Sequence, residues 1–430
     1  MHAAALAAAD PAAAVSRSLA SDPAGLRVCG ELVTMRDAGR LWVMAAGKAA
    51  RGMAGAALEA LGGRVAGGLV AHPHGAPISA SEPRDWPAAI RLRAASHPLP
   101  DESSCEAGED AARLAEGAGE DDVLLVLLSG GASALIESPR RGVALESLRD
   151  ATLALQRAGA DVRELNTVRR SLSRLKGGGL ARLAAPARTV TLALSDVLGD
   201  RPEAIGSGPT VPSPTGPHDA LAVLARHGVA GAVPEVTRAL ESAAAAEEPG
   251  PAPQGLYRVV ASNRAAAEAA AEAARARGFA ALVASTFVQG EAREAGRMVG
   301  GCAASVRAHG LPLSAPACLV FGGETTVTVR GSGRGGRNLE LALGAALALE
   351  GVERAAVFAF ATDGVDGSSS AAGAVVTGET LRRAAALGLS HHRALTENDS
   401  EPFFRALGDL WHSGPTGTNV NDVAVSLVYE

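Results

Sequence analysis

VLLVLLSGG (residues 123–131) is an unbroken apolar run that ends in one serine and two glycines. Continuous apolarity is typical of a strand buried on both faces, as in a parallel sheet that helices cover. Five further runs share this form: LWVMAAGK (41–48), TVTLALSD (189–196), LYRVVASN (256–263), CLVFGGE (318–324) and VFAFATDG (357–364). Helical patterns such as SNRAAAEAAAEAARARG (262–278) alternate with them, so the sequence predicts the α/β class.

The division of the chain follows from its one linker pattern. ESAAAAEEPGPAPQG (241–255) is Pro-rich and acidic and has no periodicity, which is typical of a linker. We therefore expect an N-terminal domain over 1–240, with a parallel sheet and helices on both faces, and a smaller C-terminal domain over 256–430. TTVTVR (325–330) alternates directly after CLVFGGE, which predicts a hairpin and hence a mixed sheet there. The first 40 residues or so are expected to be helical and to pack on the second domain.

Composition excludes several classes of protein. The 430 residues carry a formal net charge of −6 and are 47% hydrophobic, which fits a soluble globular protein without a nucleic-acid or membrane-surface partner. No apolar run approaches the roughly 20 residues of a membrane span. The four cysteines form no C-x-x-C, so we expect neither disulfides nor zinc, and a cytoplasmic location. The Ala-rich start lacks a basic n-region, and Asp10-Pro11 interrupts it, so we interpret it as a helix and its cap.

Polar residues follow all six predicted strands at their carboxyl ends, where ligands bind on open α/β sheets. They are Lys48, Ser129, Ser195-Asp196, Ser262-Asn263, Glu324 and Thr362-Asp363. Lysine is rare, because only Lys48 and Lys176 occur among the 40 lysines and arginines. A retained lysine indicates a task that a planar guanidinium cannot perform. Lys48 also opens a helix, where a cation opposes the helix dipole, so we expect it to contact phosphate or substrate.

TVTVRGSGRGGRNLELAL (326–343) contains a literal G-x-G-x-x-G at 331–336. A dinucleotide site would also need an acidic residue after a second strand, which this stretch does not offer. We favour an anion site in which backbone amides and the start of a helix act together with Arg337. Its expected binding residues are Gly333, Gly335, Gly336 and Asn338. A plain glycine-rich hairpin loop is the remaining alternative.

A second backbone site is expected in LLSGGASAL (127–135). This stretch lacks the G-x-S-x-G of a nucleophile elbow, so a nest of amides for phosphate or carboxylate is the better interpretation. Its residues are Ser129, Gly130, Gly131, Ala132 and Ser133. Lys176 ends a predicted helix before three glycines, which leaves a helix-capping role and a ligand-binding role equally open.

Two aspartate loops follow buried strands, one with Asp196 and Asp200 and the other with Asp363 and Asp366. Two such loops at strand ends indicate carboxylates that hold Mg²⁺ or accept a hydroxyl proton. We favour Asp196 and Asp363 for these roles and leave open which of the two is the base and which holds the metal.

Nine stretches occur in the same order as in the ATP-dependent glycerate 2-kinases, a family whose C-terminal part is often called the MOFRL domain. They are GKAA (47–50), SHPLPDESS (96–104), LSGGASAL (128–135), LNTVRRSLSRLKGGGLA (165–181), LSDVLGDRPEAIGSGPT (194–210), FGGETTVTV (321–329), GRGGRNLE (333–340), ATDGVDGSSSAAGA (361–374) and GPTGTNVND (414–422). The chain thus resembles this family from about residue 41 to 424. Some relatives carry the name hydroxypyruvate reductase.

The resemblance implies a Rossmann-like N-terminal domain, a C-terminal MOFRL-type domain, and an active site in the cleft between them. It implies transfer of the γ-phosphoryl of ATP to the 2-hydroxyl of D-glycerate, with Lys48, Arg337 and Asp363 as catalytic residues. We expect ATP and Mg²⁺ as cofactors, Asn263, Glu324 and Lys176 among the binding residues, and a homodimer as one candidate quaternary state. An NAD(P)H-dependent hydroxypyruvate reductase is the alternative.

Overall fold

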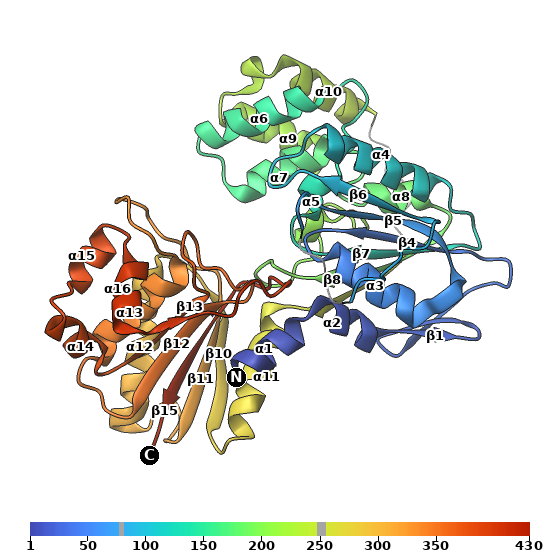
Figure 1. Ribbon diagram of the computed structural model, residues 1–430. Coiled ribbons are helices and arrows are strands. Elements are labelled where there is room, and N and C mark those ends of the chain that lie inside the picture. Colours follow the sequence, from blue (N-terminus) through green and yellow to red (C-terminus); the bar gives the residue numbers. More distant parts are fainter. Residues whose placement is uncertain (77–80, 247–254) are drawn as a thin grey trace. The chain divides into compact units, whose positions relative to one another are not determined.

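The computed structural model describes residues 1–76, 81–246 and 255–430, which form two compact units. The N-terminal unit comprises residues 11–194 and 200–260, and the C-terminal unit comprises residues 1–10, 195–199 and 261–430. Each unit is built on its own six-stranded sheet (Figure 1). In the described part of the chain, no helix is long and apolar enough to cross a membrane.

A parallel sheet forms the core of the N-terminal unit. Its strands lie in the order β6 (Ile90–Ala95), β5 (Val65–Pro73), β4 (Leu41–Ala46), β7 (Val123–Leu128), β8 (Arg188–Leu194) and β9 (Gly255–Ala261). All six side chains of β7 are buried, as its unbroken apolarity predicts. Because the chain runs outward from β4 in both directions, right-handed crossovers place helices on both faces. They are α3 (Ala50–Leu61) on one face and α4 (Glu102–Glu116) with α8 (Gly179–Ala184) on the other (Figure 1). The predicted Rossmann-like arrangement is confirmed.

Four helices of the N-terminal unit form a separate hydrophobic core beside the sheet. They are α6 (Leu145–Arg157), α7 (Val162–Ser171), α9 (Pro217–Arg226) and α10 (Pro234–Ala245). Shorter helical elements are α5 (Ala132–Leu135), η1 (Gly62–Arg64), η2 (Ile205–Ser207) and η3 (Ala230–Ala232). The predicted linker 241–255 is shorter than expected, since α10 continues to Ala245 and Gly255 already begins β9. Residues 247–254 of that prediction lie outside the described residues.

The N-terminal segment divides between the units. Helix α1 (His2–Ala9) packs on α11 (Asn263–Arg275) in the C-terminal unit, as expected. Helix α2 (Pro11–Ser18) follows in the N-terminal unit. The next residues are not helical as predicted: they form an antiparallel sheet of β1 (Leu19–Asp22), β2 (Gly25–Val28) and β3 (Glu31–Thr34) in the same unit. Short strands of four residues carry too little periodicity to be distinguished from a helix by pattern.

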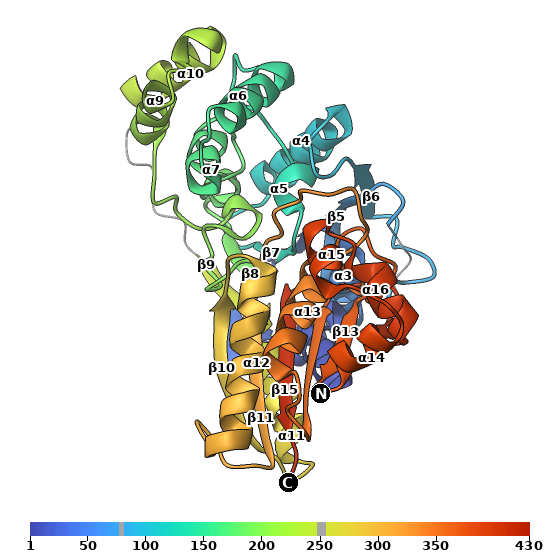
Figure 2. The same ribbon diagram turned by 90° about the vertical axis from the view of Figure 1, so that its left-hand side faces the viewer.

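A mixed sheet forms the core of the C-terminal unit, as predicted. Its strands lie in the order β10 (Ala280–Val288), β11 (Ala317–Gly323), β15 (Asp422–Val428), β12 (Ala355–Ala361), β13 (Gly373–Thr377) and β14 (Leu410–Trp411). Only β10 and β11 pair in parallel. Helices α12 (Ala292–His309) and α13 (Arg337–Leu349) cover the face opposite α1 and α11 (Figures 1 and 2). Three short helices complete the unit: α14 (Thr380–Ala386), α15 (His391–Thr396) and α16 (Ser400–Leu407).

The predicted hairpin at 325–330 is wrong, although the mixed sheet that it was meant to explain exists. These residues, all within the described ranges, form no strand beyond a single bridge between Thr326 and Glu291. The antiparallel pairing comes instead from β15, which lies between β11 and β12. Strand β15 therefore completes the sheet, and no local pattern in the sequence predicts this long-range pairing.

The glycine-rich segment 331–336 packs against residues 397–400. The Asn398 side-chain oxygen accepts hydrogen bonds from the amides of Arg330 (2.7 Å) and Gly331 (3.0 Å), and the Gly333 amide donates to the Glu397 carbonyl (2.9 Å). A Cβ added at Gly331 would lie 2.3 Å from the Glu397 carbonyl oxygen. The glycines therefore allow two backbones to approach closely, and this packing fixes the start of α13.

Lys176 forms an ion pair in the interior of the N-terminal unit. Its ammonium contacts the Glu137 carboxylate, and the two side chains are 2% and 0% exposed. Burial lowers the pKa of Lys176, and the nearby Glu137 charge opposes that shift. Lys176 also lies beyond the end of α7 at Ser171, so it does not cap that helix. Its contacts are those of a structural ion pair.

Gly331→Ala should lower the free energy of unfolding by about 1–3 kcal/mol, because the new methyl group overlaps backbone that cannot move freely. Gly301→Ala is the matched control, since Gly301 is exposed in α12 and an added Cβ there meets no atom within 4 Å. This control should gain about 0.5–1 kcal/mol from helix propensity. Urea unfolding measures both changes, and equal stabilities of the two variants would contradict the packing argument.

Lys176→Met should destabilise the protein by about 3–5 kcal/mol, because it leaves the buried Glu137 carboxylate without its counter-charge. The double variant Lys176→Met/Glu137→Leu should recover at least half of that loss, since it removes both charges together. Chemical denaturation of the single and double variants tests this coupling. A single variant as stable as the parent chain would show that the ion pair is not structural.

Candidate functional site

The N-terminal unit has a topological switch point between β4 and β7. The strand order reverses there, and the loops after the two strands separate in opposite directions, which opens the crevice where such folds bind ligands. Lys48 follows β4, and residues 129–133 follow β7. The structure thus brings together two of the predicted site elements, which lie about eighty residues apart in the sequence.

Short hydrogen bonds join these two loops. The Lys48 amide donates to the Gly130 carbonyl (2.9 Å), and the Ala49 amide donates to the Ser129 hydroxyl oxygen (3.0 Å). The Lys48 side chain is exposed, and its ammonium makes no hydrogen bond or ion pair with any residue that the structure describes. An uncompensated cation at a switch point is suited to an anionic ligand.

Backbone amides beside Lys48 are also unused. Gly131 has a φ of 86° and precedes α5, and of the described residues none accepts a hydrogen bond from the amides of Gly130, Gly131 or Ser133. The Ser133 hydroxyl pairs with that of Ser207 (2.9 Å), while the Ala132 amide donates to Ser129. Successive free amides next to a left-handed residue form the kind of concavity that holds oxyanions.

His97 is a neighbour of this loop that was not among the predicted site residues. A Cβ added at Gly131 would lie 2.9 Å from the His97 ring and 3.5 Å from the Lys48 side chain, so Gly131 is enclosed by the two residues. Burial lowers the pKa of His97, and the Lys48 charge lowers it further. A neutral imidazole therefore lies beside Lys48 at neutral pH. Its only sequence signal was its place in SHPLPDESS.

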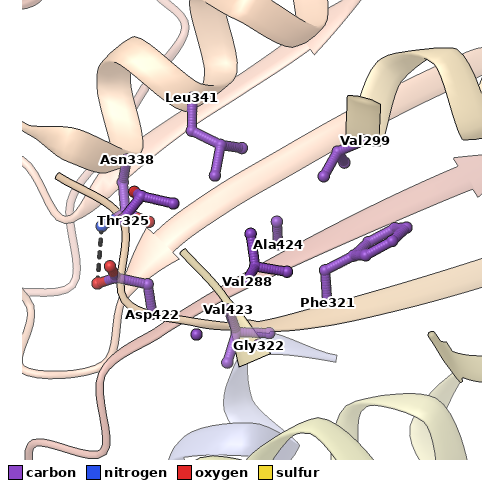
Figure 3. Close-up of a pocket in the computed structure, with 11 residues that line it drawn as sticks. Val288, Val299, Phe321, Gly322, Thr325, Asn338, Leu341, Asp422, Val423 and Ala424 are labelled. Atoms are coloured by element: carbon purple, nitrogen blue, oxygen red, sulfur yellow. Dashed lines mark hydrogen bonds between the residues drawn. The ribbon is translucent and has the colours of Figure 1, made fainter. Parts of the chain in front are cut away.

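In the C-terminal unit, Arg337 lies between two carboxylates. Its Nη1 is 2.8 Å from Glu324 Oε1, and its Nε is 2.6 Å from Asp422 Oδ2. The Asn338 side chain donates to Asp422 Oδ1 (2.9 Å; Figure 3) and to Asp366 Oδ1 (3.2 Å). Glu324 and Arg337 were each predicted as site residues, whereas Asp422 was not. The nearest signal for it was a pair of scarce asparagines, Asn419 and Asn421, in the same loop.

The cluster at the start of α13 is buried and acidic. Asp366 Oδ1 accepts from the Asn338 amide (3.0 Å) and Oδ2 from the Leu339 amide (2.8 Å), so this carboxylate caps the helix. Burial raises the pKa of Asp366. Burial also raises the pKa of Asp422 to about 7, against the opposing pull of Arg337. The adjoining cavity in Figure 3 measures only about 10 Å³, scarcely the room for one water, so it is no substrate pocket.

Three predicted binding residues of the C-terminal unit make close contacts within the unit itself. The Gly335 amide donates to the Ser368 hydroxyl (3.2 Å), and a Cβ at Gly336 would lie 2.3 Å from Asp366. The Asn263 side chain donates to the carbonyls of Val420 (2.8 Å) and Asp422 (2.9 Å). The Gly333 amide is also engaged, so two of the three predicted glycines of the anion nest, 333 and 335, use their amides within the unit. The plain glycine-rich loop describes this segment better.

Asn421 contacts Asp196 and also Thr362, the residue that precedes Asp363. The Asn421 side chain donates to the Asp196 carbonyl (2.8 Å), and the Asn421 carbonyl accepts from the Thr362 hydroxyl (2.6 Å). Both aspartates are half-buried at strand ends. Within the described ranges, no group of three or more metal-ligating side chains occurs. One or two carboxylates are nevertheless the usual protein share of a Mg²⁺ site whose other ligands are phosphates and water, so these residues fit that ion.

Comparisons with known proteins cover nearly the whole chain. Residues 1–241 match a family described as a domain of unknown function (DUF4147), and residues 317–422 match the MOFRL family. The chain is 39% identical to a D-glycerate 2-kinase of Thermotoga maritima, with 94% of each sequence covered. It is 41% identical to a putative hydroxypyruvate reductase of Agrobacterium vitis, over 99% of this chain and 92% of that protein.

Two further comparisons concern a human protein and a solved structure. The chain is 37% identical to a human glycerate kinase, over 96% of this chain and 89% of the human protein. A crystal structure of glycerate kinase from Thermotoga maritima superposes with a TM-score of 0.89 at 37% identity, covering 99% of this chain and 97% of that one. The protein therefore belongs to the glycerate 2-kinase family with a C-terminal MOFRL domain.

Proposed function

We propose that this protein is an ATP-dependent glycerate 2-kinase, which transfers the γ-phosphoryl of ATP to the 2-hydroxyl of D-glycerate and releases 2-phosphoglycerate and ADP. The observation that carries the proposal is the likeness, over nearly the full length, to proteins named glycerate kinase. The geometry of each unit supports it, because phosphoryl transfer needs positioned charge more than covalent chemistry.

The proposed roles follow from the surroundings of each group. Lys48, exposed and without a counter-ion among the described residues, neutralises the transferring phosphoryl group, and the amides of Gly130, Gly131 and Ser133 take anionic oxygens. Arg337 binds phosphate or the glycerate carboxylate through its planar fork.

Asp363 or Asp196 accepts the proton of the substrate hydroxyl, and the other carboxylate helps to hold Mg²⁺. That ion, when bound with ATP, neutralises phosphate charge and orients the nucleotide. The remaining steps belong to the chain: the base removes a proton as the hydroxyl attacks, and the cationic side chains stabilise the charge that develops.

The reductase alternative arises from the names of relatives and from the glycine motif. In a dinucleotide-binding Rossmann fold, the glycine fingerprint lies in the first βα turn and an acidic residue ends the second strand. Here the turn after β4 has Ala49 at the second glycine position, between Gly47 and Gly52, and β5 ends on His72 and Pro73. The literal G-x-G-x-x-G lies elsewhere and contacts residues 397–400. These features favour the kinase.

A coupled assay separates the two reactions. Purified protein should form a phosphate ester from D-glycerate, ATP and Mg²⁺, and should not oxidise NADH or NADPH in the presence of hydroxypyruvate. Phosphorus and carbon NMR of the product should place the phosphate on C2. Nicotinamide oxidation without ester formation would replace the kinase by the reductase.

Lys48→Arg should lower kcat by on the order of 100-fold, because a broad guanidinium cannot occupy the place of a compact ammonium. The fold should remain, as judged by circular dichroism and thermal unfolding. Arg157→Lys, an exchange of the same two cations at the exposed end of α6, is the control and should leave kcat and KM unchanged. Near-normal turnover of Lys48→Arg would remove Lys48 from the proposed catalytic set.

A further inference from the structure

Asp422 lies against the Nε–Nη2 edge of the Arg337 guanidinium. Arg337 Nε lies 2.6 Å from Asp422 Oδ2, and Arg337 Nη2 donates to Asp422 Oδ1 at 3.2 Å. One ion contact, at Nε, and one hydrogen bond, from Nη2, therefore restrain the position of the guanidinium. The Asp422 side chain is 8% exposed, whereas Glu324, which meets Nη1 from the other side, is 44% exposed. Asp422 is thus the fixed partner of Arg337, and Glu324 is the partner that solvent reaches.

Asp422 is itself rigidly mounted. It begins β15 and pairs with Gly323 of β11 on one side and Ala361 of β12 on the other. Its carbonyl accepts from Asn263 (2.9 Å), and its carboxylate accepts from Asn338 (2.9 Å). A carboxylate with strands on both sides cannot follow the guanidinium if it moves, so the guanidinium must conform to the carboxylate.

We propose that Asp422 is a positioning residue for phosphoryl transfer: it fixes the Nε–Nη2 edge of Arg337 and thereby leaves the remaining N–H groups of that arginine for an anionic substrate. The proposal rests on the proposed kinase function. Asp422 touches no substrate and acts only through Arg337. A rigidly held donor stabilises developing charge without reorganising during the reaction, which is the physical advantage of such a mount.

The proton on Asp422 should control this pairing. The groups that face its carboxylate are Arg337 and Asn338 from α13 and Asp366 from the loop after β12, with Glu324 across the guanidinium. Burial raises the pKa of Asp422 to about 7, Arg337 opposes that shift, and Asp366 adds to it. Protonation removes the negative charge that holds Arg337, so turnover that depends on the pair falls as the pH drops through this range.

Asp422→Asn, which keeps the shape and removes the charge, tests the proposal. Glycerate-dependent kcat should fall about 10- to 100-fold. In the Arg337→Lys variant, the further change Asp422→Asn should lower kcat by less than about threefold, because Asp422 then has no guanidinium to align. Asp409→Asn is the matched control in the same unit: Asp409 contacts Arg383 Nη1 with both carboxylate oxygens at 3.0 Å, and its loss should leave kcat and KM unchanged.

Two readouts keep the test decisive. If Asp422→Asn does not fold, the acid limb near pH 7 in the kcat profile of the parent chain should still be present, and Arg337→Lys should lack it. Arginine Nε–H NMR, with the Arg337 signal assigned by its loss in Arg337→Lys, should show that signal shifted or exchange-broadened in Asp422→Asn. This second readout needs no catalysis.

The outcomes separate the two proposals. If the parent chain does not phosphorylate glycerate but Asp422→Asn changes the Arg337 NMR signal, the proposed function is wrong and Asp422 still positions Arg337. An active parent chain in which Asp422→Asn retains more than half of kcat overturns the role of Asp422. The role of Asp422 is also overturned if the fold-losses in kcat of Asp422→Asn and Arg337→Lys multiply in the double variant, because the two residues then act independently.

Discussion

The helix cap at Asp366 is the interaction on which the C-terminal site depends. Its carboxylate is 1% exposed and accepts from two amides and one side-chain amide at the start of α13. A buried carboxylate is costly unless such donors surround it, and the helix dipole adds to their effect. Arg337 is the first residue of α13, so the cap fixes its Cα, and Asp422 then fixes its guanidinium. Two buried carboxylates thus determine where one cation can act.

In the N-terminal unit, the equivalent constraint is burial of the sheet. The strands β4 and β7 are buried along nearly their whole length, so no polar side chain can emerge except where they end. Because parallel strands all end at one edge, Lys48 and Ser129 must meet there once β4 and β7 are neighbours. The chemistry at this edge is therefore a consequence of the strand order, and the strand order is a consequence of which runs are apolar throughout.

The sequence predicts well what depends on local pattern and poorly what depends on long-range pairing. All six apolar runs form strands, and the loops of Lys48 and Ser129 meet as expected. The hairpin predicted at 325–330 does not form, because an alternating segment becomes a strand only where a neighbouring strand has a free hydrogen-bonding edge. Strand β15 already occupies that edge of β11. The roles of Asp422 and His97 depend on neighbours that are remote in sequence. No spacing rule links Asp422 to Arg337, which lies 85 residues away.

The two lysines show how far a composition argument extends. In a chain with so few lysines, a retained lysine indicates a position where arginine cannot replace it. There are two different physical reasons for this. In the interior, Lys176 fits a compact ammonium against Glu137 with 2% exposure, where a guanidinium would need more room and more acceptors. At the end of β4, Lys48 is exposed and has no partner in the described part of the chain, so packing cannot explain its retention. Only the surroundings distinguish a lysine that is retained for its volume from one that is retained for its charge. By that criterion Lys48, and not Lys176, is the lysine suited to bind a ligand.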